Sequence, residues 1–461
     1  MKDMELGEIV KAVEGVLVQG NRNKKIKGVS IDSRTIKADE LFIAIPGEKF
    51  NGHDFIDDAA VNGAAAFIIS DEVELPERAA YIVVNDTTEA LQQLAAYYRQ
   101  QIDDLTVIAI TGSAGKTTTK DMIAALLASK YKVHKTQGNF NNYYGLPLTL
   151  LELQGDEDIA VLEMGMSSLG EISLLTSIAL PQIGVITNVG ETHLESLGTI
   201  ENVAQGKSEL IAALPEDGIA ILNYDNSYVR DMKSVFKGEK IIYYGFNKAV
   251  DISASNIRID NKGTSFLIEY QDDKRDILID KPGRHNVYNA LAAIAVAREL
   301  AVGWNSIKKA LLSVDLSSLR WDVQKKKGGI TIINDSYNAN PLSMEAAVDA
   351  VCESAEDRVI LVLGAMLELG SNESRAHLEL GKKIADSAVD VLITVGEIAQ
   401  LIARGAIQGN MKKENIHIFD NNKQAAVLLN NILVGNDTVL VKGSRRNKME
   451  EIVEIIGGQG G

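Results

Sequence analysis

The sequence predicts an α/β protein of three domains, and three observations support this prediction. First, a chain of 461 residues is too long for a single hydrophobic core. Second, short apolar runs rich in β-branched residues alternate with helical patterns in two separate stretches, which is typical of doubly wound parallel sheets. Third, the segment ITGSAGKTTTK at residues 110–120 follows one of these runs and has the composition of a phosphate-binding loop.

The composition excludes several classes of protein. A formal net charge of −16 argues against a nucleic-acid binder that relies on a broad basic surface. The N-terminus has no apolar signal-peptide stretch, and nowhere do about 18 uncharged apolar residues run together as a membrane span requires. We therefore expect a cytoplasmic protein with no membrane insertion and no nucleic-acid partner.

The single cysteine, Cys352, excludes an internal disulfide framework and a cysteine-rich metal site. It lies in AAVDAVCESA, where apolar residues recur at helical spacing. We therefore predict a buried structural thiol rather than a nucleophile.

Residues 1–84 are predicted to form a small N-terminal α/β domain. Its apolar pattern indicates a helix at residues 6–13 and strands near residues 26–31 and 41–45, followed by the segments AAVNGAAAFIIS and AAYIVV. Residues 85–315 are predicted to form a central domain. It opens with the helix DTTEALQQLAAYYRQ, for which Asp86 or Thr87 is the expected N-cap.

The central domain is predicted to contain a parallel sheet. The runs LTVIAI, DIAVLE, IGVIT and GIAILN are too short for buried helices and read as interior strands. Residues 241–279 alternate with period two and predict a small antiparallel addition, and helices follow near residues 284–301 and 304–312. The segment SVDLSSLRW has no clear periodicity and marks the boundary to the third domain.

Residues 316–461 are predicted to form a C-terminal Rossmann-like, doubly wound domain. Five apolar runs, GGITIIND, DRVILVLG, VDVLITVG, NIHIF and DTVLVKG, alternate with helical patterns there.

The loop at residues 111–117 has the features that a phosphate site needs. Residues 106–110 are the expected strand, Gly112 and Gly115 let the backbone approach an anion, and a helix is expected from Thr117. Lys116 would reach the outer phosphates, and the Thr117 hydroxyl would bind Mg²⁺. The general pattern places a glycine where this chain has Ile110, so the residues alone support only a nucleotide site of unusual form.

Polar residues also follow two other predicted strands. Glu163 ends one apolar run, and NVGETHLESLG, with Asn188, Glu191 and His193, follows the next. Ligands of open α/β sheets bind beyond the carboxyl ends of the strands. We expect a carboxylate and an imidazole on neighbouring strand ends, where they could bind or orient Mg²⁺.

Several motifs together resemble the Mur ligase family across all three domains: TGSAGKTTTK, GNFNNYYGLPLTLL, EMGMSSLGEI, ITNVGETHLESLGT, GRHNVYNALAA, NDSYNANPLSM and VLVKGSRRNKM. The loop of that family is the shorter form without the first glycine, which accounts for Ile110. The resemblance implies an ATP- and Mg²⁺-dependent amide ligase of peptidoglycan precursor synthesis. GNFNNYYGLPLTLL and NDSYNANP favour the branch that joins D-alanyl-D-alanine to UDP-N-acetylmuramoyl-tripeptide through an acyl phosphate and a tetrahedral intermediate.

The resemblance also implies roles for individual residues. Lys116, His193, Lys207 and Arg320 are the expected catalytic residues. The expected metal site comprises Thr117, Glu163, His193 and Lys207, the last matching a lysine that is carbamylated in the family. The expected ATP site comprises Gly112, Ser113, Ala114, Gly115, Lys116, Thr117, Thr118, Asn286, Asn289, Arg320 and Asp335, and the neighbouring His285 belongs to the same family element. The chain departs from the family pattern at Ala114, often asparagine, and at Asp322, often Glu or Gln.

Two further sets of residues are candidates for substrate binding. Asn139, Asn142, Tyr337, Asn338 and Asn340 offer amides and a phenol suited to peptide groups. Ser33 and Arg34 offer a hydroxyl and a guanidinium to the uridine diphosphate, and Asp32 and His53 are weaker candidates. Glu368 and His377 belong to a family motif to which we assign no catalytic role.

We expect a monomer that closes around its substrates, because Lys116 and Arg320 are in different predicted domains. Two alternatives remain from the sequence. One is a Mur-type ligase that adds a single amino acid, and the other is a nucleotide-binding regulatory or scaffold protein without turnover.

Overall fold

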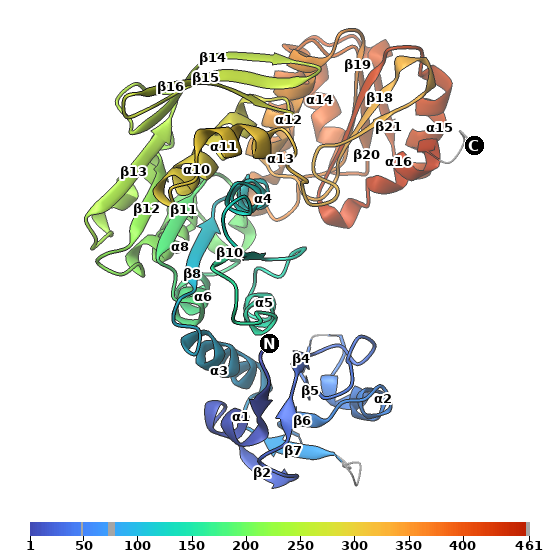
Figure 1. Ribbon diagram of the computed structural model, residues 1–461. Coiled ribbons are helices and arrows are strands. Elements are labelled where there is room, and N and C mark those ends of the chain that lie inside the picture. Colours follow the sequence, from blue (N-terminus) through green and yellow to red (C-terminus); the bar gives the residue numbers. More distant parts are fainter. Residues whose placement is uncertain (48, 72–78, 458–461) are drawn as a thin grey trace.

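A computed structural model describes residues 1–47, 49–71 and 79–457 of the chain. The described residues contain a five-stranded, a nine-stranded and a six-stranded sheet, together with a two-stranded ribbon. Figure 1 shows the N-terminal sheet at one end of the molecule, the central sheet beyond helix α3 (Thr87–Gln100) and the C-terminal sheet beside the central one. The α/β fold class with three sheet-forming regions is confirmed.

The N-terminal sheet has the strand order β2-β7-β6-β5-β4. Its strands are β2 (Val16–Gln19), β4 (Gly28–Ser30), β5 (Glu40–Ile43), β6 (Ala66–Ile69) and β7 (Ala80–Val83), with helices α1 (Leu6–Ala12) and α2 (Ile56–Val61). Strands β1 (Met4–Glu5) and β3 (Lys25–Ile26) form the antiparallel ribbon. The sequence prediction missed the edge strand β2, because Val16 and Val18 are exposed and give no buried-strand pattern.

Helix α3 connects the N-terminal sheet to the central one. Of the two predicted N-cap candidates, Asp86 and Thr87, the N-cap is Asp86, whose carboxylate accepts hydrogen bonds from the amides of Thr88 and Glu89. Leu91 and Leu94 of this helix are fully buried in a core that is shared with α1 and the N-terminal strands. The two regions therefore pack against a common helix.

The central sheet has the order β16-β15-β14-β13-β12-β11-β8-β10-β9. Its strands are β8 (Thr106–Thr111), β9 (Val133–Lys135), β10 (Ile159–Glu163), β11 (Ile183–Ile186), β12 (Ile219–Asn223), β13 (Lys240–Gly245), β14 (Ile252–Asp260), β15 (Gly263–Tyr270) and β16 (Asp273–Ile279). The antiparallel addition begins only at β15, because β13 pairs parallel to β12 and β14 parallel to β13. The predicted antiparallel start at residue 241 was wrong, since the period of a strand does not fix its direction.

Helices cover both faces of the central sheet. One face packs against α4 (Lys116–Leu127), α10 (Arg284–Glu299) and α11 (Trp304–Leu311). The other packs against α3, α5 (Gly145–Leu151), α6 (Glu171–Ala179) and α8 (Ile200–Ala212). The short helices α7 (Leu194–Leu197) and α9 (Ser227–Asp231) follow strands β11 and β12. Successive residues of β8, Ala109 and Ile110, are buried on opposite faces, which explains its continuous apolar run.

The C-terminal sheet has the order β17-β18-β22-β19-β20-β21. The strands are β17 (Asp322–Lys325), β18 (Thr331–Asp335), β19 (Val359–Leu363), β20 (Val391–Val395), β21 (Ile416–Phe419) and β22 (Thr438–Lys442). Helices α12 (Pro341–Ser354), α13 (Glu373–Ala385) and α14 (Gln400–Gln408) pack on one face, and α15 (Asn422–Ile432) and α16 (Glu450–Gly457) on the other. The doubly wound prediction is confirmed, and β17 is an additional antiparallel edge strand.

Cys352 on α12 is only partly buried, which corrects the burial part of the prediction of a buried structural thiol. It packs against the core of the C-terminal sheet, and burial raises the pKa of its thiol to about 11. The thiol therefore stays protonated near neutral pH, in agreement with a structural residue.

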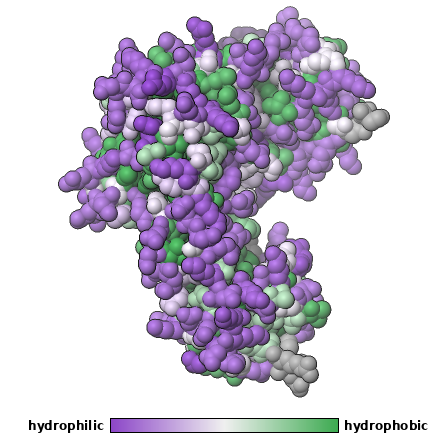
Figure 2. All heavy atoms as spheres, in the orientation of Figure 1, coloured by the Kyte–Doolittle hydropathy of each residue, from purple (hydrophilic) through white to green (hydrophobic). Residues whose placement is uncertain are grey.

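Figure 2 shows that hydrophilic side chains cover most of the face drawn. Within the described residues, no helix is both long and apolar enough to cross a membrane. The strands of the three main sheets occupy residues 16–83, 106–279 and 322–442, whereas the domain boundaries at residues 84/85 and 315/316 stay predictions.

Candidate active site

A cavity of about 840 Å³ lies where the central and C-terminal sheets meet. Its walls include the loop after β8, the ends of β10, β18 and β22, and the start of α10. It brings together every residue that was predicted to bind ATP, the metal or the peptide groups of the substrate, except Gly112. These residues are Ser113, Ala114, Gly115, Lys116, Thr117, Thr118, Asn139, Asn142, Glu163, His193, Lys207, Asn286, Asn289, Arg320, Asp335, Tyr337, Asn338 and Asn340.

The glycines of the loop are required by its geometry. Gly115 has a φ of 81° at the N-cap of α4, and a Cβ on it would lie 2.5 Å from Oδ1 of Asn289. A Cβ on Gly112 would lie 1.8 Å from Oγ1 of Thr187. Gly112 does not line the cavity, but its carbonyl oxygen accepts a hydrogen bond of 2.7 Å from Nζ of Lys116, which does. Strand β8 extends one residue beyond Ile110, so Ile110 belongs to the strand and not to the loop.

The loop after β11 holds the phosphate loop in place. Asn188 accepts a hydrogen bond from the Ala114 amide at 2.8 Å and donates one to the Ala114 carbonyl at 3.0 Å. The Ser113 hydroxyl accepts a bond from the Gly190 amide at 2.9 Å. These contacts give Asn188 a positioning role. Residues at the start of α4, where helix geometry leaves backbone amides without intrahelical partners, line the cavity.

Glu163 and His193 lie on opposite sides of the loop strand. Strand β8 runs between β10 and β11, so the two strand ends flank β8 instead of neighbouring each other as we predicted. The prediction failed because β10 and β11, which follow each other in the chain, are joined by a connection that crosses over β8, and the order of strands in the chain does not reveal such a crossover. Both side chains still line the same cavity as Lys116.

The donor atoms fit a magnesium ion bound together with phosphate. Glu163 accepts a hydrogen bond from Asn141 Nδ2 at 2.8 Å through Oε1, whereas its buried Oε2 has no partner among the described residues. A buried carboxylate oxygen without a partner is costly unless a cation or donor meets it. The described residues contain no group of three or more His, Cys, Asp or Glu able to hold a metal. A magnesium ion held at Glu163 would therefore take phosphate oxygens and waters as its remaining ligands, as is usual for Mg²⁺.

Three lysines line the cavity, the buried Lys207 and Lys442 and the half-buried Lys116. Burial lowers the pKa of the Lys207 amine well below its ordinary value, and the nearby charge of Lys116 lowers it further. Burial also lowers the pKa of Lys116, while Glu163 opposes that shift. Lys207 on α8 is thus a desolvated amine, and within the described part of the chain no carboxylate favours its charged form.

The C-terminal region supplies the opposite wall. The Arg320 guanidinium lies 4.2 Å from the ring centroid of Tyr337, a cation–π contact that orients both side chains. Asp335 accepts a hydrogen bond from the Trp321 amide at 3.2 Å and forms an ion pair of 2.6 Å with Lys442. Lys442 also donates to the Asn338 carbonyl at 3.0 Å.

The sequence analysis missed Lys442 and Asn141, which both line the cavity. Lys442 is the charged last residue of the buried strand β22, and this position is the same signal that identified Glu163. Asn141 carried no signal of its own, because Asn139 and Asn142 lie beside it in the sequence and only the fold places Asn141 against Glu163.

Several residues predicted to bind the peptide substrate or ATP form hydrogen bonds within the protein. Asn340 Oδ1 accepts a bond from the Ser343 amide and caps α12, while Nδ2 donates to the Ser113 carbonyl at 3.2 Å. Asn142 Oδ1 accepts a bond from the Gly145 amide at 2.8 Å. Asn286 Nδ2 donates to the Pro282 carbonyl at 2.9 Å. These contacts fix the side chains at the cavity wall.

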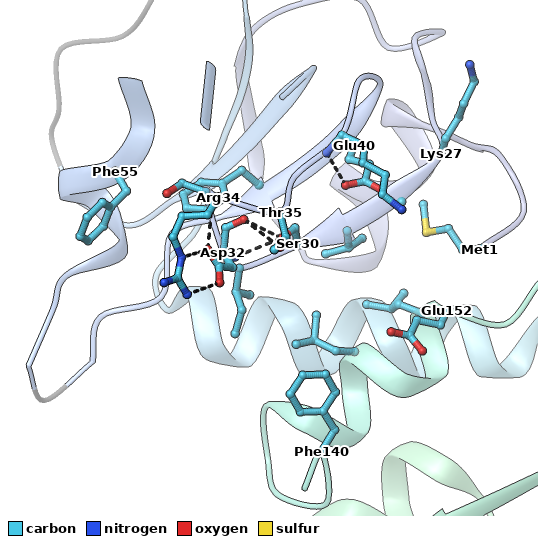
Figure 3. Close-up of a pocket in the computed structure, with 18 of the residues that line it drawn as sticks. Met1, Lys27, Ser30, Asp32, Arg34, Thr35, Glu40, Phe55, Phe140 and Glu152 are labelled. Atoms are coloured by element: carbon cyan, nitrogen blue, oxygen red, sulfur yellow. Dashed lines mark hydrogen bonds and ion pairs between the residues drawn. The ribbon is translucent and has the colours of Figure 1, made fainter. Parts of the chain in front are cut away.

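A second cavity, of about 1190 Å³, lies between strand β4 and helix α5. It contains Ser33 and Arg34, and Figure 3 shows the Arg34 guanidinium turned toward Asp32. Arg34 Nε and Nη2 donate to the two Asp32 oxygens at 2.9 and 2.7 Å, and this pairing holds the pKa of Asp32 below its ordinary value. Phe140 reaches the cavity from the central region.

His53 lines neither cavity and has a structural role. Its Nε2 accepts a hydrogen bond from the Ser70 amide at 3.0 Å, and its Nδ1 lies 2.8 Å from Asn51 Oδ1. Burial lowers its pKa, so the ring is neutral and joins two loops of the N-terminal region.

Comparisons with known proteins agree with this geometry. Three family models match: "Mur ligase family, catalytic domain" at residues 25–99, "Mur ligase middle domain" at residues 110–297 and "Mur ligase, glutamate ligase domain" at residues 319–445. UDP-N-acetylmuramoyl-tripeptide--D-alanyl-D-alanine ligase from Bacillus subtilis is 40% identical over 450 residues, covering 97% of this chain and 96% of the relative.

Two solved structures are similar over nearly the whole chain. MurF from Acinetobacter baumannii superposes with a TM-score of 0.91 at 29% identity and 99% coverage of both chains. MurF ligase from Thermotoga maritima in complex with ADP superposes with a TM-score of 0.82 at 30% identity, covering 93% of this chain and 97% of that one.

Proposed function

The chain belongs to the Mur ligase family, and we propose that it joins D-alanyl-D-alanine to UDP-N-acetylmuramoyl-tripeptide in an ATP-dependent reaction. The observation that carries this proposal is the cavity in which the phosphate loop, the free Glu163 oxygen and Lys207 face Arg320 and Asp335 of the C-terminal region. Curated relatives that match nearly the full length of the chain carry the same activity in their names.

The reaction must bring an anionic carboxylate to an anionic γ-phosphate. Transfer of that phosphate to the tripeptide carboxylate releases ADP and gives an acyl phosphate. Attack by the dipeptide amine then forms the amide and releases inorganic phosphate and a proton. Positive charge around the phosphates is therefore the main requirement for catalysis. Lys116 from the loop and Arg320 from the opposite wall supply two such charges in one cavity.

Magnesium ions would be held by Thr117 and Glu163 next to the phosphates and by His193 and Lys207 nearby. Bound Mg²⁺ neutralises phosphate charge and fixes the geometry of transfer. The chain's own contribution is to orient Glu163 through Asn141 and to leave the second carboxylate oxygen free of protein partners among the described residues.

Lys207 would act as a carbamate. An amine adds to CO₂ only when it is unprotonated, and burial lowers the pKa of Lys207, which shifts the amine toward that form. The carbamate is an anion with oxygen ligands, which are the ligands that Mg²⁺ prefers. This gives a chemical reason for a lysine at the wall of a metal site.

The nucleotide base and ribose would bind near Asn286, Asn289 and Asp335, because these residues line the same cavity as the phosphate loop. Asn139, Asn142, Tyr337 and Asn338 would bind the peptide groups, while Asn340 would contribute by holding Ser113. Ser33 and Arg34 would bind the uridine diphosphate in the second cavity. We propose domains at residues 1–84, 85–315 and 316–461, and a cytoplasmic monomer.

The experiment is phosphate release measured with UDP-N-acetylmuramoyl-tripeptide, ATP, Mg²⁺ and D-alanyl-D-alanine, with each omitted in turn. We expect release only when all four are present, and a loss of at least about 100-fold in Lys116→Ala, as is typical when a charge that stabilises the transition state is removed. Lys130→Ala, at an exposed lysine beyond the end of α4, is the control. Unchanged release in Lys116→Ala would contradict the mechanism.

A further inference from the structure

One carboxylate crosses from the C-terminal region to the proposed metal site. Oε2 of Glu368 lies 2.8 Å from Nδ1 of His193, although the two residues belong to regions built on different sheets. Both residues have positive φ values, 65° for Glu368 and 54° for His193. Left-handed backbone at two non-glycine residues that meet each other is uncommon and tends to occur at functional sites.

The loop that carries Glu368 is held firmly in place. His377 is fully buried, its Nε2 accepts a hydrogen bond from the Met366 amide at 2.9 Å, and its Nδ1 lies 2.7 Å from the Glu373 carbonyl. Burial lowers the pKa of His377, so the ring is neutral and Nδ1 is the donor. His377 therefore fixes the loop two residues before Glu368.

The loop also contacts the central region through its backbone. The Glu368 carbonyl oxygen accepts a hydrogen bond from the Glu195 amide at 3.2 Å. Glu195 belongs to α7, the helix for which His193 is the N-cap residue. The side chain and the backbone of Glu368 thus contact the same short helix segment at two separate points.

We propose that Glu368 is a positioning residue that orients His193 for the metal. Its carboxylate accepts a hydrogen bond from Nδ1–H of His193, which leaves the lone pair of Nε2 for coordination. A histidine that binds a metal commonly donates its other ring N–H to a carboxylate, which fixes the tautomer and the ring orientation. This inference rests on the proposed function of His193 as a metal ligand.

The carboxylate comes from the C-terminal region, so this orientation depends on the contact between the two regions. When that contact is made, His193 gains the partner that selects its metal-binding tautomer. Glu368 would therefore couple docking of the C-terminal region to completion of the site. It gives a role to a motif, LELGSNESRAHLELG, that the reaction chemistry leaves unexplained.

The same interface offers a control. Arg375 Nη2 lies 2.6 Å from Oε1 of Glu191, two residues before His193. This ion pair also joins the two regions, but it does so through Glu191 and not through the His193 ring. If Glu368 acts only as one more tie between the regions, removing Arg375 should have a similar effect.

The test uses the full-length protein with UDP-N-acetylmuramoyl-tripeptide, a non-hydrolysable ATP analogue and Mn²⁺ in place of Mg²⁺. Pulsed EPR reports whether an imidazole nitrogen is bound to Mn²⁺, and titration of the free Mn²⁺ signal gives the apparent affinity. The variants are Glu368→Ala, Glu368→Gln, Arg375→Ala and His193→Ala. Steady-state kinetics of the first three give kcat and the half-saturating Mg²⁺ concentration separately.

We expect His193→Ala to abolish the nitrogen coupling and Glu368→Ala to weaken it, with a loss of about 10- to 100-fold in apparent metal affinity. Glu368→Gln keeps an acceptor oxygen and should retain most of the coupling, and Arg375→Ala should change the affinity less than about 3-fold. Equal losses of nitrogen coupling and metal affinity in Glu368→Ala and Arg375→Ala would overturn the positioning role of Glu368 but not the proposed function. Full nitrogen coupling in His193→Ala would overturn the metal role of His193 and the inference with it.

Discussion

Asn340 donates its side-chain amide to the carbonyl oxygen of Ser113 at 3.2 Å, and so the C-terminal region touches the phosphate loop directly. Both residues are buried. The same asparagine caps helix α12 through its other side-chain atom. One side chain thus connects the start of α12 with the loop that would hold the triphosphate, and the two functions can be separated by substitution.

Asn340→Ser should keep the helix cap and lose the contact with the loop. Serine is as good an N-cap residue as asparagine, but its hydroxyl is too short to do both. We expect a change in the free energy of unfolding below about 1 kcal/mol together with a clear rise in the KM for ATP. Asn340→Ala should add a capping loss of about 1 kcal/mol. Denaturant titration and initial rates measure both quantities, and an unchanged KM in Asn340→Ser would contradict a role in docking.

Gly115→Ala should disable the phosphate loop. The left-handed conformation costs a non-glycine residue about 1–2 kcal/mol, and the new Cβ would lie 2.5 Å from Asn289 Oδ1. We expect ATP binding, measured by calorimetry, to weaken at least about 10-fold.

Gly303→Ala is the matched control for this substitution. Gly303 is also a helix N-cap residue, but it has an ordinary φ of −73°. A Cβ on it would meet no atom of the other described residues within 4 Å, its chain neighbours aside. If Gly115→Ala and Gly303→Ala bound ATP with equal affinity, the requirement for glycine at position 115 would be contradicted.

Lys207→Ala should be inactive and should be rescued by small carboxylates. If Lys207 works as a carbamate, acetate or propionate can occupy the space and restore oxygen ligands. If it works as an ammonium, methylammonium should rescue and carboxylates should not. Phosphate release with increasing concentrations of each ion distinguishes the two outcomes, and chloride at equal ionic strength is the control.

Arg34→Ala should weaken binding of the uridine nucleotide substrate and leave ATP binding unchanged. A hydrogen bond to a charged group contributes about 1.5–3 kcal/mol, which corresponds to about 10- to 150-fold in KM for UDP-N-acetylmuramoyl-tripeptide. Arg275→Ala removes another exposed arginine, which pairs with Asp273 on strand β16, and serves as the control. A parallel rise in the KM for ATP would show that the second cavity is not a separate substrate site.

His285 should make the protein less stable as the pH falls. Burial lowers its pKa to about 4, below the ordinary value, so the unfolded chain binds a proton between the two pKa values and the folded chain does not. Its stabilising contribution is therefore present above the ordinary pKa and is lost as the pH falls toward the folded value. The half-buried ring keeps some hydration, so we expect a loss of about 1–2 kcal/mol between about pH 7 and about pH 5.

Denaturant titrations at the two pH values measure this loss, and His285→Gln should reduce it because glutamine does not titrate. His417→Gln is the control, at a half-buried histidine on the edge strand β21 of the C-terminal sheet. If the free energy of unfolding depended on pH equally in wild type and His285→Gln, His285 would not be the group responsible for the loss of stability.

Local patterns predicted much of the fold. The strand, loop and helix around Gly115 were predicted correctly, and the N-cap of α3 is one of the two predicted candidates, Asp86. Each of these features depends on a few consecutive residues whose backbone preferences agree. The direction of β13 and the position of β8 between β10 and β11 were not predictable in this way. Strand direction and order depend on crossovers, and residues within one strand carry no information about them.

The same distinction applies to the site. Charged residues at the ends of buried strands, such as Glu163, stand out in the sequence because an apolar run would otherwise continue. Their partners do not stand out. Asn141 with Glu163, Lys442 with Asp335 and Glu368 with His193 each join segments that only the folded chain brings together.

The central claim is tested most directly by identifying the product. The protein is incubated with UDP-N-acetylmuramoyl-tripeptide, ATP, Mg²⁺ and, in separate reactions, D-alanyl-D-alanine or single amino acids, and the products are analysed by mass spectrometry. We predict one product, the UDP-N-acetylmuramoyl-pentapeptide, formed with one ADP and one phosphate per amide only in the reaction with the dipeptide. Turnover with a single amino acid and none with D-alanyl-D-alanine would contradict the account.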